Sequence, residues 1–282
     1  MIALISDIHS NFEALCAVMD DIKNHEVESI YCLGDIVGYG PDPEKCTDLV
    51  MQEAGYTILG NHDFALLNFP FGFNPIAAEV IRKTQEIMRP GPQEDKHDAA
   101  SSGPLYYACM TRENIPPCII MEHSKPDRWA FLKGLPVKSE QDEILYVHGS
   151  PLDPTFEYVF PDSFKTAWNP DRIEELMLSV RRICFCGHTH MPCAITSDAE
   201  CIHPSQCNFQ LSLDPRKKYI INLGSVGQPR DGDPRACYLL FDPEKKAIEW
   251  RRVGYDIESV IKKSDAMCGK GNWCGARLRS GR

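Results

Sequence analysis

The 282-residue sequence has no run of about 20 uncharged apolar residues, the length that a membrane-spanning helix needs. It also lacks an excess of basic residues, because 30 Lys and Arg stand against 40 Asp and Glu and the formal net charge is −10. Affinity for nucleic acid or anionic lipid depends on clustered positive charge. We therefore expect no membrane partner and no stable binding of nucleic acid.

A disulfide framework is also not indicated, although cysteine is plentiful. Thirteen cysteines are an odd number in a long chain, and the opening residues MIALISDIHS carry charge where a secretory signal needs an apolar stretch. Reduced thiols and a cytoplasmic location are therefore expected. Cys193, Cys201, His203 and Cys207 fall within fifteen residues but lack a paired C-x-x-C, which favours structural or loop cysteines over a zinc site.

Apolar runs and helical periodicity alternate in the first 65 residues. Residues 1–5 and the later segments SIYC and YTIL are predicted strands, and helical patterns lie between them. This β-α-β-α-β order predicts parallel strands with covering helices. From residue 144 onward, strands follow one another with few helices between them, which favours antiparallel pairing.

The sequence predicts one domain over residues 1–265 with an insertion. Residues from about 64 to 140 have a helical texture, with a stretch rich in Pro, Gly and Ser around 90–104, and we interpret them as a helical cap. Residues 266–282 are rich in Gly and Arg and show no periodicity. We expect this last segment to be a flexible C-terminal tail.

Polar residues that can bind metal follow five of the predicted strands. The segments SDIH, LGD, GNHD, VHGS and GHTH supply Asp7, His9, Asp35, Asn61, His62, His148, His188 and His190. Each of these residues alone could serve as a turn former, a helix cap or a core residue. However, five of the nine histidines lie in this set, and functional groups of α/β sheets gather outside the carboxyl ends of strands. We therefore expect the five loops to meet.

The residue types in these loops are those of a two-metal site. Carboxylate and amide oxygens suit hard ions such as Mn²⁺, and imidazoles suit Fe and Zn. Mn and Fe are the first candidates, and Zn and Ni are also compatible. Two ions about 3.5–4 Å apart lower the pKa of a bridging water and neutralise charge on a phosphoryl group.

The ordered motifs D-x-H, G-D, G-N-H-D, V-H-G and G-H-x-H resemble those of the calcineurin-like metallophosphoesterases over roughly residues 1–65 and 144–255. The resemblance implies an α/β fold in which two mixed β-sheets pack as a sandwich with flanking helices. It also implies roles for the loop residues: Asp7, His9 and His190 for one metal, Asn61, His148 and His188 for the other, and Asp35 as the bridge. His62 resembles the unliganded histidine that contacts the phosphate and protonates the leaving oxygen.

One departure from the family pattern bears on the substrate. In the protein phosphatases and the bacterial symmetrical diadenosine tetraphosphatase, the second motif resembles G-D-x-V-x-R-G, with an arginine that grips the phosphate. Here it reads GDIVGYG, with Tyr39 at the arginine position and Gly38 where the protein phosphatases carry an aspartate. The later segment NLGSVGQPRDGDP looks like the bacterial phosphodiesterase-like branch. Its Arg230 could supply the missing contact or could pair with Asp231 or Asp233.

These features predict a metal-dependent phosphoesterase that hydrolyses phosphodiesters or small nucleotides by attack of a metal-bridging hydroxide. The alternatives are an activity like that of a dinucleoside tetraphosphatase or a Ser/Thr protein phosphatase, and a non-catalytic metal-binding scaffold. A scaffold has no need of an unliganded acid such as His62. Tyr39, Phe64 and the segment FPFGF at 69–73 could stack on a nucleobase, although packing within the cap is the commoner role of such residues.

Overall fold

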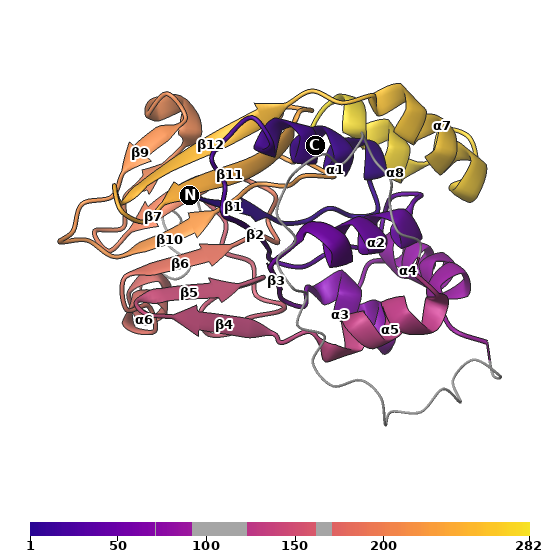
Figure 1. Cartoon of the computed structure of the whole chain (residues 1–282), viewed down its shortest axis with the longest axis horizontal. Coiled ribbons are helices and arrows are strands. Elements are labelled where there is room, and N and C mark those ends of the chain that lie inside the picture. The colour runs from indigo at the N-terminus through magenta and orange to yellow at the C-terminus, as the bar shows by residue number, and fades with distance from the viewer. Residues whose placement is uncertain (71, 92–122, 162–170) are drawn as a thin grey trace.

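The strands form two mixed six-stranded sheets, with the orders β3-β2-β1-β11-β12-β9 and β4-β5-β6-β10-β7-β8 (Figure 1). The computed structural model describes residues 1–70, 72–91, 123–161 and 171–282. The strands are β1 Ile2–Ile5, β2 Ser29–Cys32, β3 Tyr56–Thr57, β4 Lys138–Gln141, β5 Ile144–Val147, β6 Ile183–Cys186, β7 Cys193–Thr196, β8 Cys201–Ile202, β9 Gln210–Ser212, β10 Tyr219–Asn222, β11 Ala236–Asp242 and β12 Ala247–Val253. The helices are α1 Phe12–Ile22, α2 Pro43–Glu53, α3 Asn61–Leu67, α4 Pro75–Met88, α5 Lys125–Gly134, α6 Arg172–Leu178, α7 Ile257–Cys268 and α8 Trp273–Ala276, with short 3₁₀ turns η1 Pro204–Gln206 and η2 Arg277–Arg279.

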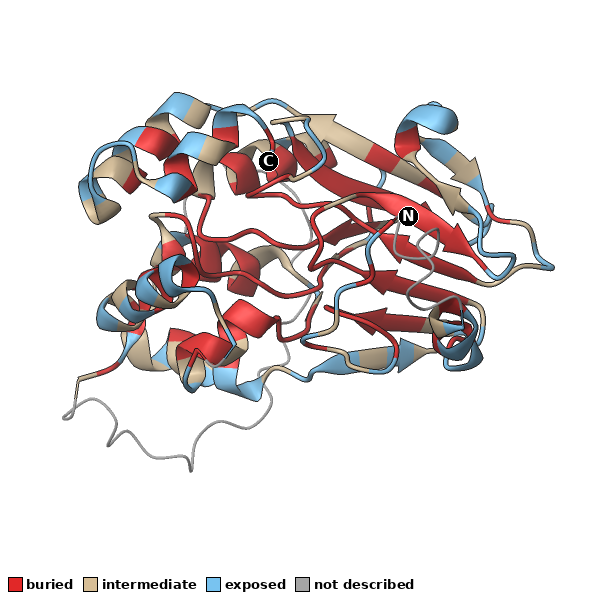
Figure 2. Ribbon diagram, turned by 180° about the vertical axis from the view of Figure 1, so that it is seen from behind, coloured by how far each residue is buried: buried red, intermediate tan, exposed pale blue. Residues whose placement is uncertain are grey.

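The two sheets pack face to face, and helices cover their outer faces. The layer between the sheets contains Leu4 and Trp250 from the first sheet and Phe185 and Ile221 from the second. The helices α1 and α2 cover the outer face of the first sheet, and α6 covers that of the second. The central strands are buried along most of their length (Figure 2). The predicted sandwich of two mixed sheets with flanking helices is confirmed.

The alternation of side chains along each strand explains why both faces of the sheets are buried. In β1, Ala3 and Ile5 point toward the helical layer, whereas Leu4 points toward the second sheet. In β6, Phe185 faces the interface between the sheets and Cys184 faces α6. Successive side chains of a strand point to opposite faces, so a continuous apolar run supplies both layers.

The pairing of the strands differs from the sequence prediction in the second half of the chain. The strands β1, β2 and β3 are parallel, as predicted. However, β5 is parallel to β6 and β6 is parallel to β10, so the expectation of antiparallel pairing there was only partly right. The link between β5 and β6 contains α6, and a crossover of that length allows parallel strands.

The segment that we interpreted as a cap contributes helices beside the first sheet. The helices α3, α4 and α5 pack on one another, and α2 packs on α4 and α5. Arg128 of α5 holds the carboxylate of Asp48 in α2 through two hydrogen bonds of 2.8 and 2.7 Å. Most of the stretch rich in Pro, Gly and Ser lies outside the described residues. The limits of the cap and of the single domain therefore stay predictions.

The C-terminal segment is folded, so the prediction of a flexible tail was wrong. The helix α7 extends to Cys268, and α8 and η2 follow it. Cys274 packs with Tyr39, Ala77 and Val80, and Leu278 packs with α7. The segment is too short for periodicity to show, and its contacts come from residues far away in the sequence.

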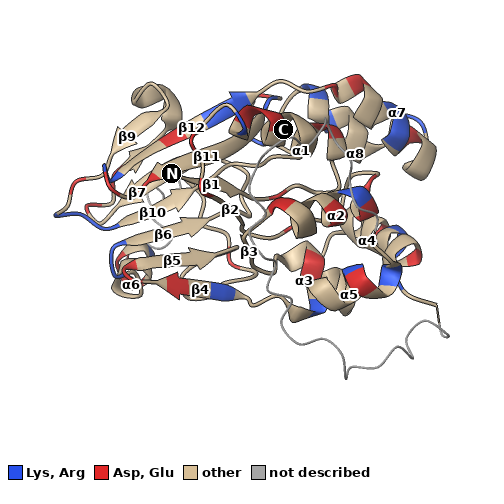
Figure 3. Cartoon of the chain, in the orientation of Figure 1, with Lys and Arg blue, Asp and Glu red and all other residues tan. Residues whose placement is uncertain are grey.

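No helix in the described part of the chain is long and apolar enough to cross a membrane. Basic and acidic residues both occur along α4, α5 and α7 (Figure 3). These helices therefore present a mixed surface to the solvent, without one dominant sign of charge.

Candidate metal centre

The five polar loops predicted from the sequence meet at one edge of the two sheets. They follow β1, β2, β3, β5 and β6, and backbone hydrogen bonds tie them together, among them Asp7 N to Gly34 O at 3.0 Å and His9 N to Asp35 O at 2.9 Å. All eight predicted side chains are at most 5% exposed: Asp7, His9, Asp35, Asn61, His62, His148, His188 and His190. The loops therefore form a single buried polar cluster.

Backbone strain is concentrated in these loops. Five of the predicted ligands adopt left-handed backbone conformations with φ between 48° and 65°: Asp7, His9, Asp35, His188 and His190. Residues other than glycine seldom adopt this region, and strain of this kind is found at functional sites. Here it turns each side chain back toward the common centre immediately after its strand ends.

Within the cluster the donor atoms form overlapping groups. Asp7, His9 and His190 form one group, with His190 Nε2 lying 3.1 Å from Asp7 Oδ1. Asp35, His148 and His188 form another, with His148 Nε2 lying 3.3 Å from Asp35 Oδ2.

Asn61 and a second contact of Asp35 complete this arrangement. Asn61 Oδ1 lies 3.0 Å from His148 Nε2, and Asp35 Oδ2 lies 3.6 Å from His9 Nε2. The carboxylate of Asp35 therefore faces histidines from both groups, which is the position of a bridge. The residues of each implied ligand set thus lie close to one another, and their assignment to two metals stays a prediction.

The orientation of the histidine rings fits metal binding. The Nδ1 atoms of His9, His148 and His190 face the backbone oxygens of Val37, Leu33 and Gln228 at 3.2, 2.8 and 2.5 Å. His188 is turned the other way, with its Nε2 atom 3.1 Å from the oxygen of Phe156. Hydrogen bonds of this kind fix the tautomer of metal-ligating histidines, so the remaining nitrogen of each ring presents a lone pair to the centre.

The contact between His9 and His190 also fits metal binding. Their Nε2 atoms are 3.0 Å apart, although both rings have a carbonyl oxygen at Nδ1. If Nδ1 carries the proton in both rings, two lone pairs face each other inside the protein. Such a pair is stable only with a cation or a proton between its members, so the residues present fit a bound metal ion.

The electrostatics of the cluster favour charged carboxylates. Burial by itself raises the pKa of Asp35, but His148 and His62 hold it well below its ordinary value. Burial likewise raises the pKa of Asp7, and His190 and His148 hold it below its ordinary value. Burial lowers the pKa of His148, but Asp35 and Asp7 raise it to about 9. A metal ion bound at His148 would have to replace a proton on its ring.

His62 lies between the cluster and the solvent-facing pocket. Its backbone N–H donates to Asp35 Oδ1 at 2.8 Å, and its ring centroid lies 4.7 Å from that of His9. It is close enough to His9 and Asp35 to form a third donor group with them. Its Nδ1 atom is buried and has no hydrogen-bond partner in the described part of the chain. Burial lowers the pKa of its ring to about 4, with Asp35 opposing the effect.

A pocket of about 600 Å³ opens beside His62 and His188. Aromatic side chains form much of its wall: Tyr39, Phe64, Phe69, Phe73, Phe156 and Tyr158. The ring of Tyr158 stacks on that of His188 with a centroid separation of 3.7 Å. Pockets of this volume hold small organic ligands, so the centre has room beside it for a substrate group.

Arg230 and Tyr39, the two predicted substrate contacts, are close to each other. The guanidinium carbon of Arg230 lies 5.8 Å from the centroid of the Tyr39 ring. Asp231 pairs with Arg252, and Asp233 pairs with Arg235, so neither carboxylate is taken up by Arg230. The choice left open by the sequence is thereby decided against an ion pair within this loop.

Several residues that support the centre were missed from the sequence. Asp63 accepts hydrogen bonds from the backbone N–H groups of Ile36, Val37 and Gly60 and so joins two of the loops. Asn222, at the end of β10, donates to Thr189 Oγ1 at 3.0 Å and holds the loop of His188 and His190. Asn222 is the last residue of β10, and Asp63 follows Asn61 and His62 directly in the segment GNHD, so these positions were the available signal.

The cysteines near residue 200 do not gather into a comparable donor group. Cys201 Sγ lies 3.9 Å from His203 Nε2, and Cys207 Sγ donates to backbone oxygens. In the described residues, the donor groups of three or more are those at the strand ends. The interpretation as structural or loop cysteines therefore stands.

This fold and this cluster of aspartates and histidines define a class of metal-binding phosphoesterases. Residues 1–246 match the calcineurin-like phosphoesterase superfamily domain, and the chain belongs to that family. It is therefore a hydrolase of the phosphoesterase type.

Individual relatives extend over the full length of the chain. The uncharacterized protein MJ0912 of Methanocaldococcus jannaschii is 34% identical over 290 aligned residues, which cover 100% of this chain and 98% of that protein. The crystal structure of a metallophosphoesterase from Sphaerobacter thermophilus has 30% identity and a TM-score of 0.73, covering 100% and 98% of the two chains. The hypothetical protein PH1004 from Pyrococcus horikoshii, at 17% identity and a TM-score of 0.67 over 100% and 99% of the chains, has a similar fold.

Proposed function

We propose that this protein is a phosphoesterase that uses two metal ions to hydrolyse phosphodiesters or small nucleotides. The observation that carries the proposal is the position of the Asp35 carboxylate between two donor groups, 3.6 Å from His9 of one and 3.3 Å from His148 of the other, with His62 beside it. Bound there, two ions would neutralise charge on the phosphoryl oxygens and supply a hydroxide nucleophile. Mn and Fe are the first candidates, and Zn and Ni are compatible with the same residues.

His62 is proposed to contact the phosphate and protonate the leaving oxygen. With a pKa of about 4, its ring is neutral in the free protein at pH 7. A phosphate anion beside the ring would raise that pKa through the same Coulombic effect by which Asp35 opposes burial. The proton would therefore be taken up with the substrate and given to the departing oxygen.

The residues around Tyr39 favour diesters and nucleotides over phosphoproteins. Tyr39 cannot provide the positive charge of the family arginine, and a diester carries less charge at the reacting phosphorus than a monoester dianion does. An ideal Cβ at Gly38 would lie 2.3 Å from His62 Nδ1, so the aspartate of the protein phosphatases does not fit at this position. The aromatic pocket offers stacking surfaces for a nucleobase.

A substrate comparison tests this proposal against the dinucleoside tetraphosphatase, protein phosphatase and scaffold alternatives. The kcat/KM values of bis(p-nitrophenyl) phosphate, p-nitrophenyl phosphate, diadenosine tetraphosphate and a phosphopeptide would be measured in the same metal and buffer. We expect the diester or the nucleotide to be preferred. A tenfold preference for the phosphopeptide would contradict the interpretation of Tyr39, and metal binding without hydrolysis of any of the four would favour a scaffold.

A cytoplasmic location stays a prediction.

A further inference from the structure

Two arginines from distant parts of the sequence share one acceptor next to the metal centre. Arg230 Nη2 donates to Gln228 Oε1 at 2.9 Å, and Arg277 Nη1 donates to the same oxygen at 3.3 Å. Gln228 belongs to the loop after β10, whereas Arg277 belongs to η2 in the C-terminal segment. The amide oxygen of Gln228 is neutral and therefore compensates neither positive charge.

Neighbouring arginines on the same two segments are paired with carboxylates, in contrast to Arg230 and Arg277. Arg235 and Arg279 each hold a carboxylate at short distance, 2.6 Å from Asp233 and 2.7 Å from Glu258. Among the described residues, no Asp or Glu side chain forms an ion pair with either Arg230 or Arg277, and Arg277 Nε donates to the main-chain oxygen of Arg282. Two guanidinium groups that share a neutral acceptor repel each other, and an anion bound between them would offset that repulsion.

The surroundings of the two guanidinium groups are half-buried and pre-arranged. Arg230 Nε is buried and has no hydrogen-bond partner in the described part of the chain. Arg277 lies over the ring of Trp273 with its guanidinium carbon 4.2 Å from the centroid, and burial together with the charge of Arg230 lowers its pKa to about 10. A stacked guanidinium has lost much of its freedom before any ligand binds, and so it can hold an anion in a defined geometry.

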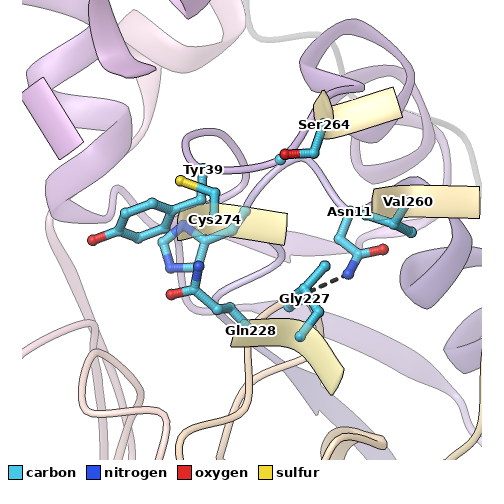
Figure 4. Close-up of a pocket in the computed structure, with 10 residues that line it drawn as sticks. Asn11, Tyr39, Gly227, Gln228, Val260, Ser264 and Cys274 are labelled. Atoms are coloured by element: carbon cyan, nitrogen blue, oxygen red, sulfur yellow. Dashed lines mark hydrogen bonds between the residues drawn. The ribbon is translucent and has the colours of Figure 1, made fainter. Parts of the chain in front are cut away.

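The loop of Arg230 is fixed to both the metal centre and the C-terminal segment. Arg230 N donates to His190 O at 3.3 Å, and Gly232 N donates to Gly281 O at 2.8 Å. Figure 4 shows Tyr39, Gln228 and Cys274 meeting around a cavity of about 10 Å³, so α8 packs directly behind the centre. Arg230 therefore adjoins the centre through His190, and Arg277 adjoins Arg230 through Gln228.

We propose that Arg230 and Arg277 form an anion site that binds a second phosphate group, linked to the phosphate that lies at the metal centre. The inference rests on the proposed function and narrows its substrate class to esters that carry a phosphoanhydride, such as nucleoside polyphosphates. The reacting phosphate lies at the metals and Arg230, and the next phosphate in the chain lies between Arg230 and Arg277.

Binding of inorganic phosphate and of the non-hydrolysable imidodiphosphate tests the proposal by calorimetry, with metal-loaded and chelator-treated protein. Arg277→Gln should weaken the binding of imidodiphosphate about tenfold or more, because a charge-assisted hydrogen bond to the second phosphate is lost. The same change should weaken the binding of inorganic phosphate less than twofold. Arg277→Lys should lose less affinity for imidodiphosphate than Arg277→Gln does, because the positive charge remains. Arg279→Gln is the matched control on the same turn, and it should change neither affinity.

Equal weakening of both anions by Arg277→Gln, or no weakening of imidodiphosphate, would overturn the proposal. So would equal effects of the Arg277 and Arg279 substitutions. The measurements are equilibria and need no turnover. If Arg277 selects imidodiphosphate but no phosphoester is hydrolysed, the anion site stands and the proposed function fails. If diesters are hydrolysed but Arg277 has no influence on either anion, only this inference fails.

Discussion

Replacing Gly38 with alanine should displace His62 without removing any metal ligand. Gly38 has a φ of +95°, and a Cβ atom there would lie 2.3 Å from Nδ1 and 3.0 Å from Cγ of the His62 ring. Atoms that are not bonded do not approach so closely, so the ring must move. The three nearest atoms to the added Cβ all belong to His62, and the ligand clusters are not touched directly.

Two separate costs are expected. The backbone conformation disfavours any residue with a Cβ, which lowers the free energy of unfolding by about 1–2 kcal/mol. The movement of His62 removes a positioned proton donor, and such groups contribute about 10²–10⁴-fold to the rate. Metal content should remain that of the wild-type protein.

Gly269 provides a matched control for the backbone cost. Its φ is +94°, and a Cβ atom there would have no neighbour within 4 Å. Gly269→Ala should therefore lower the free energy of unfolding by a similar amount, measured by urea denaturation, but leave kcat unchanged. The Gly38→Ala, His62→Gln double variant should be no slower than His62→Gln alone, because both changes remove the same contribution. Equal loss of activity in the two glycine variants, or loss of metal from Gly38→Ala, would refute the reasoning.

Three further changes test other parts of the site and fold. Asp35→Asn should remove both metals, because the carboxylate of Asp35 faces both donor groups. Elemental analysis measures the metal content, and loss of only one metal would show that Asp35 is a terminal ligand. His62→Gln should keep both metals and slow hydrolysis about 10²–10⁴-fold with alkoxide leaving groups. The rate should fall less with nitrophenolate, because this leaving group needs little protonation. Equal losses of rate with both leaving groups would indicate that His62 binds the phosphate instead. Burial raises the pKa of Asp21, but hydrogen bonds from Arg251 and Tyr238 bring it below its ordinary value of 3.8. The charged carboxylate therefore stabilises the folded state above pH 3.8, and this stabilisation is lost as the pH falls through the folded-state pKa. Urea denaturation at pH 7 and pH 3 should show a smaller pH dependence in Asp21→Asn than in the wild type; an unchanged dependence would exclude this pair of contacts as its source.

Much of the metal centre could be predicted from local patterns. Five of the strands belong to short runs rich in apolar residues, and each is followed within four residues by Asp, Asn or His, as in the segments that supply Asp7, Asp35 and His188. Parallel neighbouring strands bring their carboxyl ends to one edge, so the order of the motifs along the chain is enough to predict that the loops meet. Local patterns therefore predicted that the loops meet and that they carry metal-binding residue types, whereas the sandwich of two mixed sheets followed from the resemblance to the calcineurin-like metallophosphoesterases.

The contacts among charged groups could not be predicted in the same way. Arg230 has two carboxylates within three residues, yet Asp231 and Asp233 pair with Arg252 and Arg235. Which carboxylate a guanidinium meets depends on distances through space of a few ångströms, and β12 brings Arg252 to this loop through its antiparallel pairing with β11. Proximity in sequence does not report such distances.

The order of the C-terminal segment also could not be predicted from local patterns. Residues 273–279 have no periodicity that predicts order, but Cys274 and Leu278 are buried by residues of α4, α7 and the loop of Tyr39. A segment this short is ordered by the surface on which it packs, since its own helical propensity is too weak to fold it alone. The sequence determined which side chains can bind metal, whereas only the tertiary structure decided that Arg277 joins Arg230 at the edge of the metal centre.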